Sequence, residues 1–114
     1  MKTSSKKGKG RSLQQWVRDL IIDKFNLTSD DVRSTIMGCS GEDILLSPAA
    51  RQRLNVSIEC KSRARVAVYG FYEQAKTNCP GDAEPVVVVK QNRSIPLCVV
   101  RAEHYFELLR KANS

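Results

Sequence analysis

The sequence predicts an α/β fold in which a mixed sheet is flanked by helices. Two observations carry this expectation: apolar residues recur at helical spacing over 13–25 and 66–78, and short runs rich in Val and Ile lie between and after those segments, separated by turn residues. The chain has 114 residues, of which 41% are apolar, so it can bury one modest core. We therefore expect a single domain over residues 12–114.

A basic segment precedes that domain and is expected to be a flexible arm. Residues 1–11 lack hydrophobic periodicity and carry five bases and no acid, namely Lys2, Lys6, Lys7, Lys9 and Arg11. The net charge of the chain is +7, but the 14 bases that remain of its 19 face 12 acids, so the domain itself is nearly neutral. Such an arm can bind nucleic acid through counterion release. The alternative is a solvated segment that only aids solubility.

The elements of the first half follow from periodicity and turn chemistry. Ser12 and Gln15 have the spacing of a capping box, and apolar residues then repeat from Leu13 to Phe25, which predicts a helix over 13–25. Ser47 and Pro48 are typical of a helix start. The elements expected next are a strand at 32–37, a strand at 42–47, a helical turn at 48–54 and a strand at 56–61.

The second half predicts a helix, a hairpin and a final helix. Residues 66–78 place apolar side chains at i, i+3, i+4 and i+7 and end before Pro80-Gly81. The remaining elements are strands at 86–90 and 95–101, joined by a turn, and a short helix marked by Tyr105 to Leu109. The expected order is α-β-β-β-α-β-β-α.

Chemistry is expected first at Glu59-Cys60-Lys61. Side chains alternate along a strand, so Glu59 and Lys61 share one face while Cys60 takes the other. A carboxylate there can hold a hard divalent cation, and the Cys60 carbonyl can add an oxygen ligand. The Lys61 ammonium can orient a water or offset charge on a phosphoryl group.

A second acidic position lies at the head of the preceding strand. Glu42 and Asp43 precede Glu59 by a short helical turn, so antiparallel pairing of the two strands can bring Asp43 beside Glu59. Converging carboxylates repel unless a cation lies between them, which is the reason to expect Mg²⁺ or Mn²⁺. The alternative is a surface ion pair, with Glu42 or Asp43 bound to Lys61 or Arg63.

The helix at 66–78 offers one further candidate, Gln74. Its i−4 and i−7 neighbours are Gly70 and Ala67, so a phosphate can approach this stripe and accept a hydrogen bond from the amide. The alternative is that Gly70 only permits close packing on the sheet.

The combination of Gly41-Glu42-Asp43, Glu59-Cys60-Lys61 and Gln74 resembles the PD-(D/E)XK nuclease superfamily, especially its small Holliday-junction resolvase-like and phage-encoded members. The resemblance covers about residues 10–109 and implies a restriction-endonuclease-like sheet. It implies that Asp43 and Glu59 bind Mg²⁺ or Mn²⁺ together with the Cys60 backbone carbonyl, that Lys61 assists the water, and that Gln74 supports the site or contacts the scissile strand.

Two positions depart from the family pattern. Gly41-Glu42 stands where Pro would precede the Asp, so Glu42 is kept as an alternative metal ligand. Resolvase-like members often add a Glu from the first helix, and this helix offers Gln14, a weaker Mg²⁺ ligand, with Asp19 as a distant second.

Basic side chains on either side of the two strands are expected to bind DNA phosphates, with solvated loop charges as the alternative; the expected DNA-binding residues are Lys6, Lys7, Lys9, Arg11, Arg51, Arg53, Arg63 and Arg65. No segment is typical of a secretory signal or a membrane span, which predicts a cytoplasmic protein, in the host cytoplasm if a phage encodes it.

The function expected is a Mg²⁺-dependent endonuclease acting on DNA, with branched or Holliday-junction DNA as the substrate that the resemblance favours. A homodimer is expected if junctions are resolved, because two symmetric strands must be cut. The alternative is a nucleic-acid-binding module of the same fold that does not cut.

Overall fold

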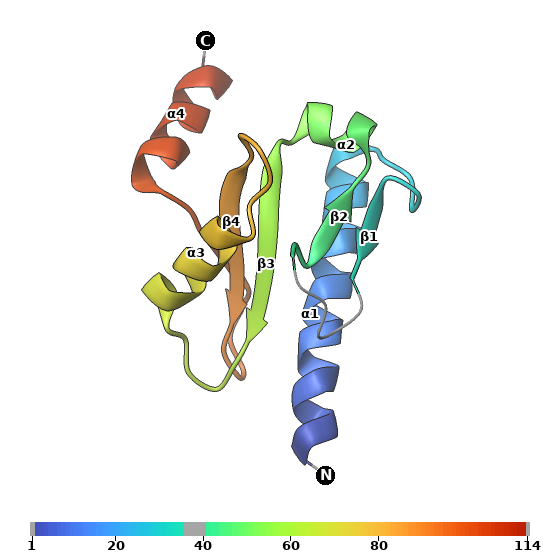
Figure 1. The fold of residues 1–114 in the computed structure, drawn as a ribbon, viewed down its shortest axis with the longest axis vertical. Helices are drawn as coiled ribbons and strands as arrows, with labels where there is room; N and C mark the ends of the chain where they lie inside the picture. The colour runs from blue at the N-terminus through green and yellow to red at the C-terminus, as the bar shows by residue number, and fades with distance from the viewer. Residues whose placement is uncertain (1, 36–40, 114) are drawn as a thin grey trace.

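The computed structural model describes residues 2–35 and 41–113, with side chains from Gly8 onward (Figure 1). The elements in chain order are α1 (Lys2–Phe25), β1 (Val32–Ser34), β2 (Ile44–Leu46), α2 (Pro48–Arg53), β3 (Val56–Ser62), α3 (Val68–Thr77), β4 (Glu84–Lys90), β5 (Leu97–Val99) and α4 (Ala102–Ala112). The predicted order of helices and strands is confirmed for these residues.

The strands of the described residues form two sheets. β3 pairs in parallel with β4, and β5 adds to β4 in antiparallel fashion, so the predicted hairpin is confirmed and the three-stranded sheet is mixed. β1 and β2 form a separate antiparallel pair. The expectation that 42–47 pairs as a strand with 56–61 is wrong, because β2 makes its ladder with β1. The segment before β2 is joined to β3 by the backbone bond from Asp43 N to Ile58 O.

Alternation along β3 and β4 gives the sheet two different faces. One face packs on α1, and its buried residues are Leu13, Val17, Ile21, Ile58, Cys60, Val86 and Val88. The other face packs under α3, where the cluster comprises Val87, Val89 and Ala75, with Phe71 and Tyr72 against them. Helices thus cover both faces, which is the layered arrangement expected of an α/β fold (Figure 1).

The start of α1 corrects two predictions. The helix begins at Lys2, so residues expected to form an irregular arm are helical, and Ser12 lies inside the helix rather than at its N-cap. Hydrophobic periodicity marks only the part of a helix that packs, and the segment before Leu13 has no proline to stop the backbone. α1 consequently extends beyond the sheet at its N-terminal end (Figure 1).

The entry to α2 fixes the end of β2. The Ser47 hydroxyl accepts from Ala50 N at 3.1 Å and donates to Asp31 Oδ1 at 2.7 Å, and Pro48 occupies the first turn, as predicted for this helix start. In residues 2–35 and 41–113, none of the helices combines the length and apolar character that a bilayer crossing requires.

Candidate active site

Glu59 and Lys61 lie on the face of β3 that α3 covers. Glu59 is only 4% exposed, and its Oε2 lies 3.3 Å from the Lys61 Nζ. The ammonium also lies 5.5 Å from the centre of the Phe71 ring, which belongs to α3. The pair is therefore a desolvated ion pair between the sheet and a helix, and the predicted sharing of one face is confirmed.

Asp43 reaches the edge of β3 from the start of β2. Its backbone N donates to Ile58 O at 3.1 Å, while its side-chain Oδ2 accepts from Cys60 N at 2.7 Å. On its other side the Asp43 carbonyl accepts from Thr35 N at 2.9 Å. The preceding Gly41 has φ +95°, a value that glycine adopts at little cost. Backbone bonds to both neighbouring strands thus hold the carboxylate against β3.

The two carboxyl groups are electrostatically linked. Burial raises the pKa of Asp43, opposed by the hydrogen bond from Cys60 N and by the charges of Lys61 and Arg63. Burial also raises the pKa of Glu59, and the negative charge of Asp43 raises it further, against the lowering effects of Lys61 and of the Asn78 amide. Glu59 therefore lies in the electrostatic field of Asp43, and a cation between the two carboxylates would offset their repulsion.

The donor atoms suit a hard divalent cation. Asp43 and Glu59 supply carboxylate oxygens, which Mg²⁺ and Mn²⁺ prefer. In an extended strand the N–H and C=O of one residue face the same edge, so the Cys60 carbonyl lies on the edge that Asp43 contacts. Its thiol is buried in the core on the α1 side, where burial raises its pKa. Within the described residues no group of three or more His, Cys, Asp or Glu side chains is placed to hold a metal ion.

Glu42 is engaged elsewhere. Its two carboxylate oxygens each accept from Arg51 Nη2 at 3.1 Å, and Arg51 Nη1 donates to Val56 O. This partly buried pair holds Arg51 of α2 where it also binds the start of β3. Of the two acids that the sequence offered, Asp43 is therefore the one that lies beside Glu59.

The two glutamine candidates lie in different surroundings. Gln74 is exposed on α3, and its carbonyl accepts from Asn78 N. Gln14 is 4% exposed on α1, whose core residues pack against the Cys60 side of β3 rather than the Glu59 side. The amide that acts on Glu59 is that of Asn78, which the sequence reasoning missed because a polar residue after a helix has many ordinary explanations.

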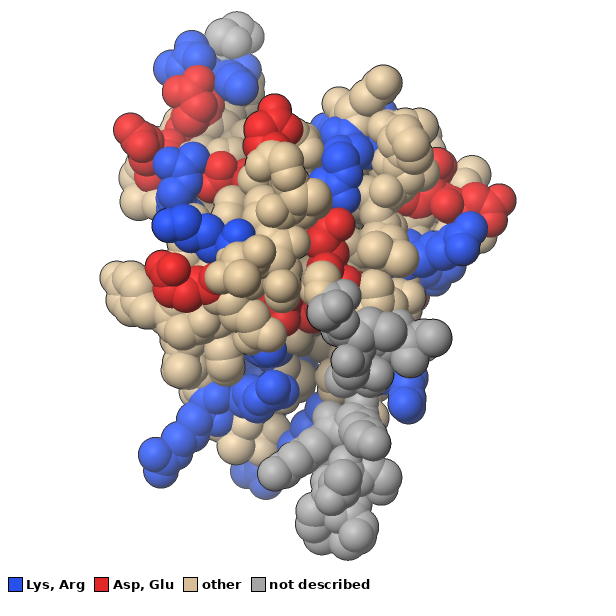
Figure 2. Space-filling view, in the orientation of Figure 1, with Lys and Arg blue, Asp and Glu red and all other residues tan. Residues whose placement is uncertain are grey.

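The basic candidates divide into engaged and open side chains. Arg51 is bound to Glu42, Arg53 Nη1 donates to Phe25 O at 2.7 Å, and Lys9 Nζ donates to Asn92 Oδ1 at 2.9 Å. Arg11, Arg63 and Arg65 are exposed, as are Lys9 and Arg53, and Arg63 Nη1 donates to Ser62 O at 3.3 Å. The side chains of Lys6 and Lys7 lie outside the described residues. Figure 2 shows acidic side chains at the centre of the face that carries β3 and several Lys and Arg side chains at its lower end.

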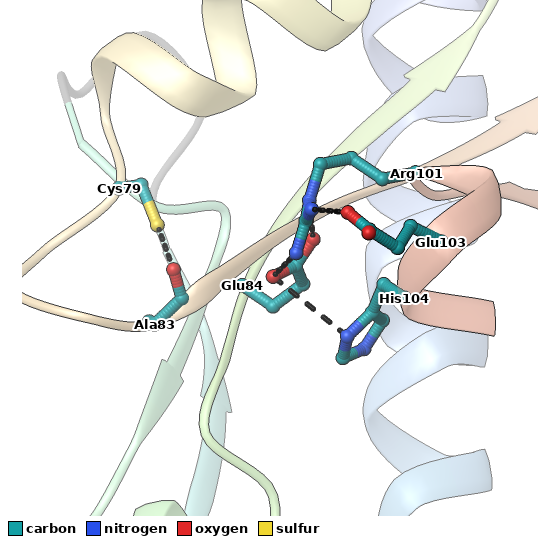
Figure 3. A network of polar contacts seen from close by, with 6 residues as sticks. All are labelled: Cys79, Ala83, Glu84, Arg101, Glu103 and His104. Atoms are coloured by element: carbon teal, nitrogen blue, oxygen red, sulfur yellow. Dashed lines mark hydrogen bonds and ion pairs between the residues drawn. The ribbon is translucent and has the colours of Figure 1, made fainter. Parts of the chain in front are cut away.

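A second polar cluster fastens α4 to the sheet and lies apart from the carboxylate pair. Arg101 donates to both oxygens of Glu84, at 2.7 and 2.9 Å, and His104 Nδ1 lies 3.7 Å from Glu84 Oε1 (Figure 3). Arg101 lowers the pKa of Glu84 through these bonds. No residue of α4 is buried, so this cluster is a principal attachment of the helix.

Comparison of the chain with protein-family models, with curated proteins and with solved structures finds no match.

Proposed function

We propose that this chain is a divalent-metal-dependent endonuclease that hydrolyses phosphodiester bonds in DNA. The observation that carries the proposal is the meeting of two desolvated carboxylates, Asp43 and Glu59, at the β2–β3 junction, with the Lys61 ammonium 3.3 Å from Glu59. The order of elements around this point also resembles the PD-(D/E)XK superfamily, which has a restriction-endonuclease-like fold.

The residues that would hold Mg²⁺ or Mn²⁺ are Asp43, Glu59 and, through its carbonyl, Cys60. When bound, the cation would polarise the phosphate and lower the pKa of a coordinated water. Lys61 is held by Glu59 and by the face of Phe71, so its ammonium is available to orient the attacking water or to offset charge on the phosphoryl oxygens. The Cys60 N–H donates to Asp43 Oδ2, so the other Asp43 oxygen would be the one to bind a cation.

The substrate class follows from charge and from the resemblance. The exposed Arg63 and Arg65 come directly after β3 and suit the phosphates on either side of a cut. Branched or Holliday-junction DNA is the substrate that the family resemblance favours, and a homodimer would supply two sites for two strands.

One observation favours the rival function, a DNA-binding module without turnover. Gln14 is a buried neutral amide where resolvase-like nucleases often carry a carboxylate, so the proposed metal ligands include only two acids. This rival retains the basic surface but predicts no cutting.

The test is cleavage of supercoiled plasmid and of a synthetic four-way junction, each with Mg²⁺, with Mn²⁺ and with a chelator. Glu59→Gln and Lys61→Ala are compared with Lys76→Ala, which removes an exposed lysine of α3. Metal-dependent nicking that both site variants lose and the control retains supports the endonuclease. DNA binding by the folded wild type without nicking in either metal supports the rival.

A further inference from the structure

A groove of about 680 Å³ lies between the N-terminal half of α1 and the loop that joins β4 to β5. We refer to it as the α1–loop groove; its described lining residues are Gly8, Lys9, Ser12, Leu13, Trp16, Ser62, Lys90, Asn92, Arg93 and Pro96. Its volume falls within the range of about 300–1,000 Å³ that small-ligand sites occupy, so a nucleotide fits within it.

The lining combines an aromatic surface with positive charge. Trp16 is 47% exposed although tryptophan is usually well covered, and it lines the groove together with Leu13 and Pro96. Lys9, Lys90 and Arg93 add three cations, and none of the described lining residues is acidic. Apolar surface beside several cations suits a ligand with flat rings and a negatively charged backbone.

The loop side of the groove is held in a defined shape. Arg93 has φ +62°, in the left-handed region that a non-glycine residue rarely adopts. The turn is closed by the bond from Ser94 N to Gln91 O at 3.1 Å, and Lys9 Nζ ties α1 to Asn92. A strained arginine held at the rim of a basic groove is the kind of outlier that points to binding.

We propose that the α1–loop groove binds unpaired nucleotides of a DNA strand, with a base stacked on Trp16 and phosphates bound by Lys9, Lys90 and Arg93. The base must be unpaired because duplex DNA keeps the faces of its bases stacked on one another, so an indole ring cannot reach them. The assignment rests on the proposed nuclease function and narrows its branched substrates to those that carry an unpaired strand, such as flaps.

One end of the groove lies at the end of β3, next in the chain to the candidate active site. Ser62 lines the groove and directly follows Lys61 on β3, and the exposed Arg63 and Arg65 come next. Because side chains alternate along a strand, Ser62 lies on the face of β3 that packs on α1, whereas Lys61 lies on the face that α3 covers. A strand that leaves the groove would therefore pass around the end of β3, past Arg63 and Arg65, before it reaches the carboxylates.

The sole tryptophan makes the proposal directly measurable, because the fluorescence of the protein's tryptophan reports on residue 16 alone. In a chelator, so that no strand is cut, the full chain is titrated with an oligothymidylate of about 12 nucleotides, with a blunt duplex of the same length and with thymidine monophosphate. We expect fluorescence quenching and at least about tenfold tighter binding for the single strand than for either comparator. Equal affinity for the duplex, equal affinity for the mononucleotide, or absence of quenching would overturn the proposal.

Two variants locate the binding, measured by anisotropy of a labelled oligonucleotide. Trp16→Leu should weaken single-strand binding about tenfold and leave duplex binding unchanged. Arg93→Gly accommodates φ +62°, so the loop keeps its shape, and should reduce the slope of log affinity against log salt by about one. Lys76→Ala removes an equal charge outside the groove and should change neither quantity; unchanged binding in both groove variants would refute the assignment.

Failure of the groove and failure of the proposed nuclease can be told apart. If the protein binds single strands in chelator but does not nick DNA in Mg²⁺ or Mn²⁺, the groove assignment stands and the nuclease proposal fails. If the protein nicks plasmid in a metal-dependent way but binds single strand and duplex equally, the nuclease proposal stands and the groove assignment fails.

Discussion

Replacement of Lys61 by Met removes the ammonium that faces Glu59 while keeping an apolar stem of similar length beneath Phe71. At 3.3 Å the attraction between the two charges is about 5 kcal/mol for an effective dielectric constant of about 20. The loss of this attraction is partly offset because the side chain of Lys61, which is 11% exposed, no longer has to be desolvated on folding. We therefore expect Lys61→Met to lower the free energy of unfolding by about 3 kcal/mol near neutral pH.

The same variant should show a diagnostic dependence on pH. The pKa of Glu59 is raised in the folded protein, so as pH rises the unfolded chain loses the Glu59 proton before the folded protein does. The free energy of unfolding therefore falls as pH rises from the ordinary pKa of Glu59 through its raised pKa. Without Lys61 the pKa of Glu59 rises further. The difference between variant and wild type should therefore be largest at about pH 7.5 and should shrink toward about pH 4.5, where the folded state protonates Glu59.

Urea denaturation followed by circular dichroism at both pH values measures the effect. Lys76→Met on the exposed side of α3 is the matched control and should change stability by less than about 0.5 kcal/mol. A loss in Lys61→Met of equal size at both pH values would refute an ionised Glu59, and no loss at neutral pH would refute the desolvated pair itself.

Three further predictions concern the surroundings of the site. Millimolar Mg²⁺ should raise the midpoint of thermal unfolding near neutral pH relative to NaCl of equal ionic strength, but not in Asp43→Asn and not at about pH 4.5, where protons compete for the raised-pKa carboxyls. Glu42→Gln, which loses the charge that Arg51 binds, should cost about 1–2 kcal/mol in urea denaturation yet retain the Mg²⁺ effect; loss of that effect would make Glu42 a ligand. Arg101→Ala should speed amide hydrogen exchange across α4 and leave β3 unchanged, whereas Arg110→Ala, whose ion pair with Glu107 lies within α4, should leave both unchanged.

Local pattern predicted the order of elements well because each element carries its own signal. The apolar spacing after Val66 and the turn chemistry at Ser47-Pro48 report on neighbours a few residues away, and both helices form there. The same reasoning misplaced the start of α1, since hydrophobic periodicity reports burial and not helicity, and the turns before Leu13 project beyond the core.

The pairing of strands could not be predicted in the same way. β2 could pair with either β1 or β3. Its pairing with β1 depends on how the strands pack beneath α1, and a short apolar run in the sequence does not indicate that packing. That Asp43 lies near enough to act on the pKa of Glu59 agrees with the sequence-based expectation, because the short α2 connection limits how far apart the ends of β2 and β3 can lie. Asn78 comes from a distant helix end, and only the tertiary structure brings it to Glu59.

The bond from Cys60 N to the Asp43 side chain uses a donor that a continuous sheet would give to a backbone carbonyl. A carboxylate thus stands where a rung of the ladder would otherwise be, and β2 and β3 stay separate at that point. An engineer who repaired this irregularity with a β-branched residue at position 43 would free the amide to recruit the neighbouring strand. The sheet would then become more regular at the expense of the opening in which the acidic groups meet.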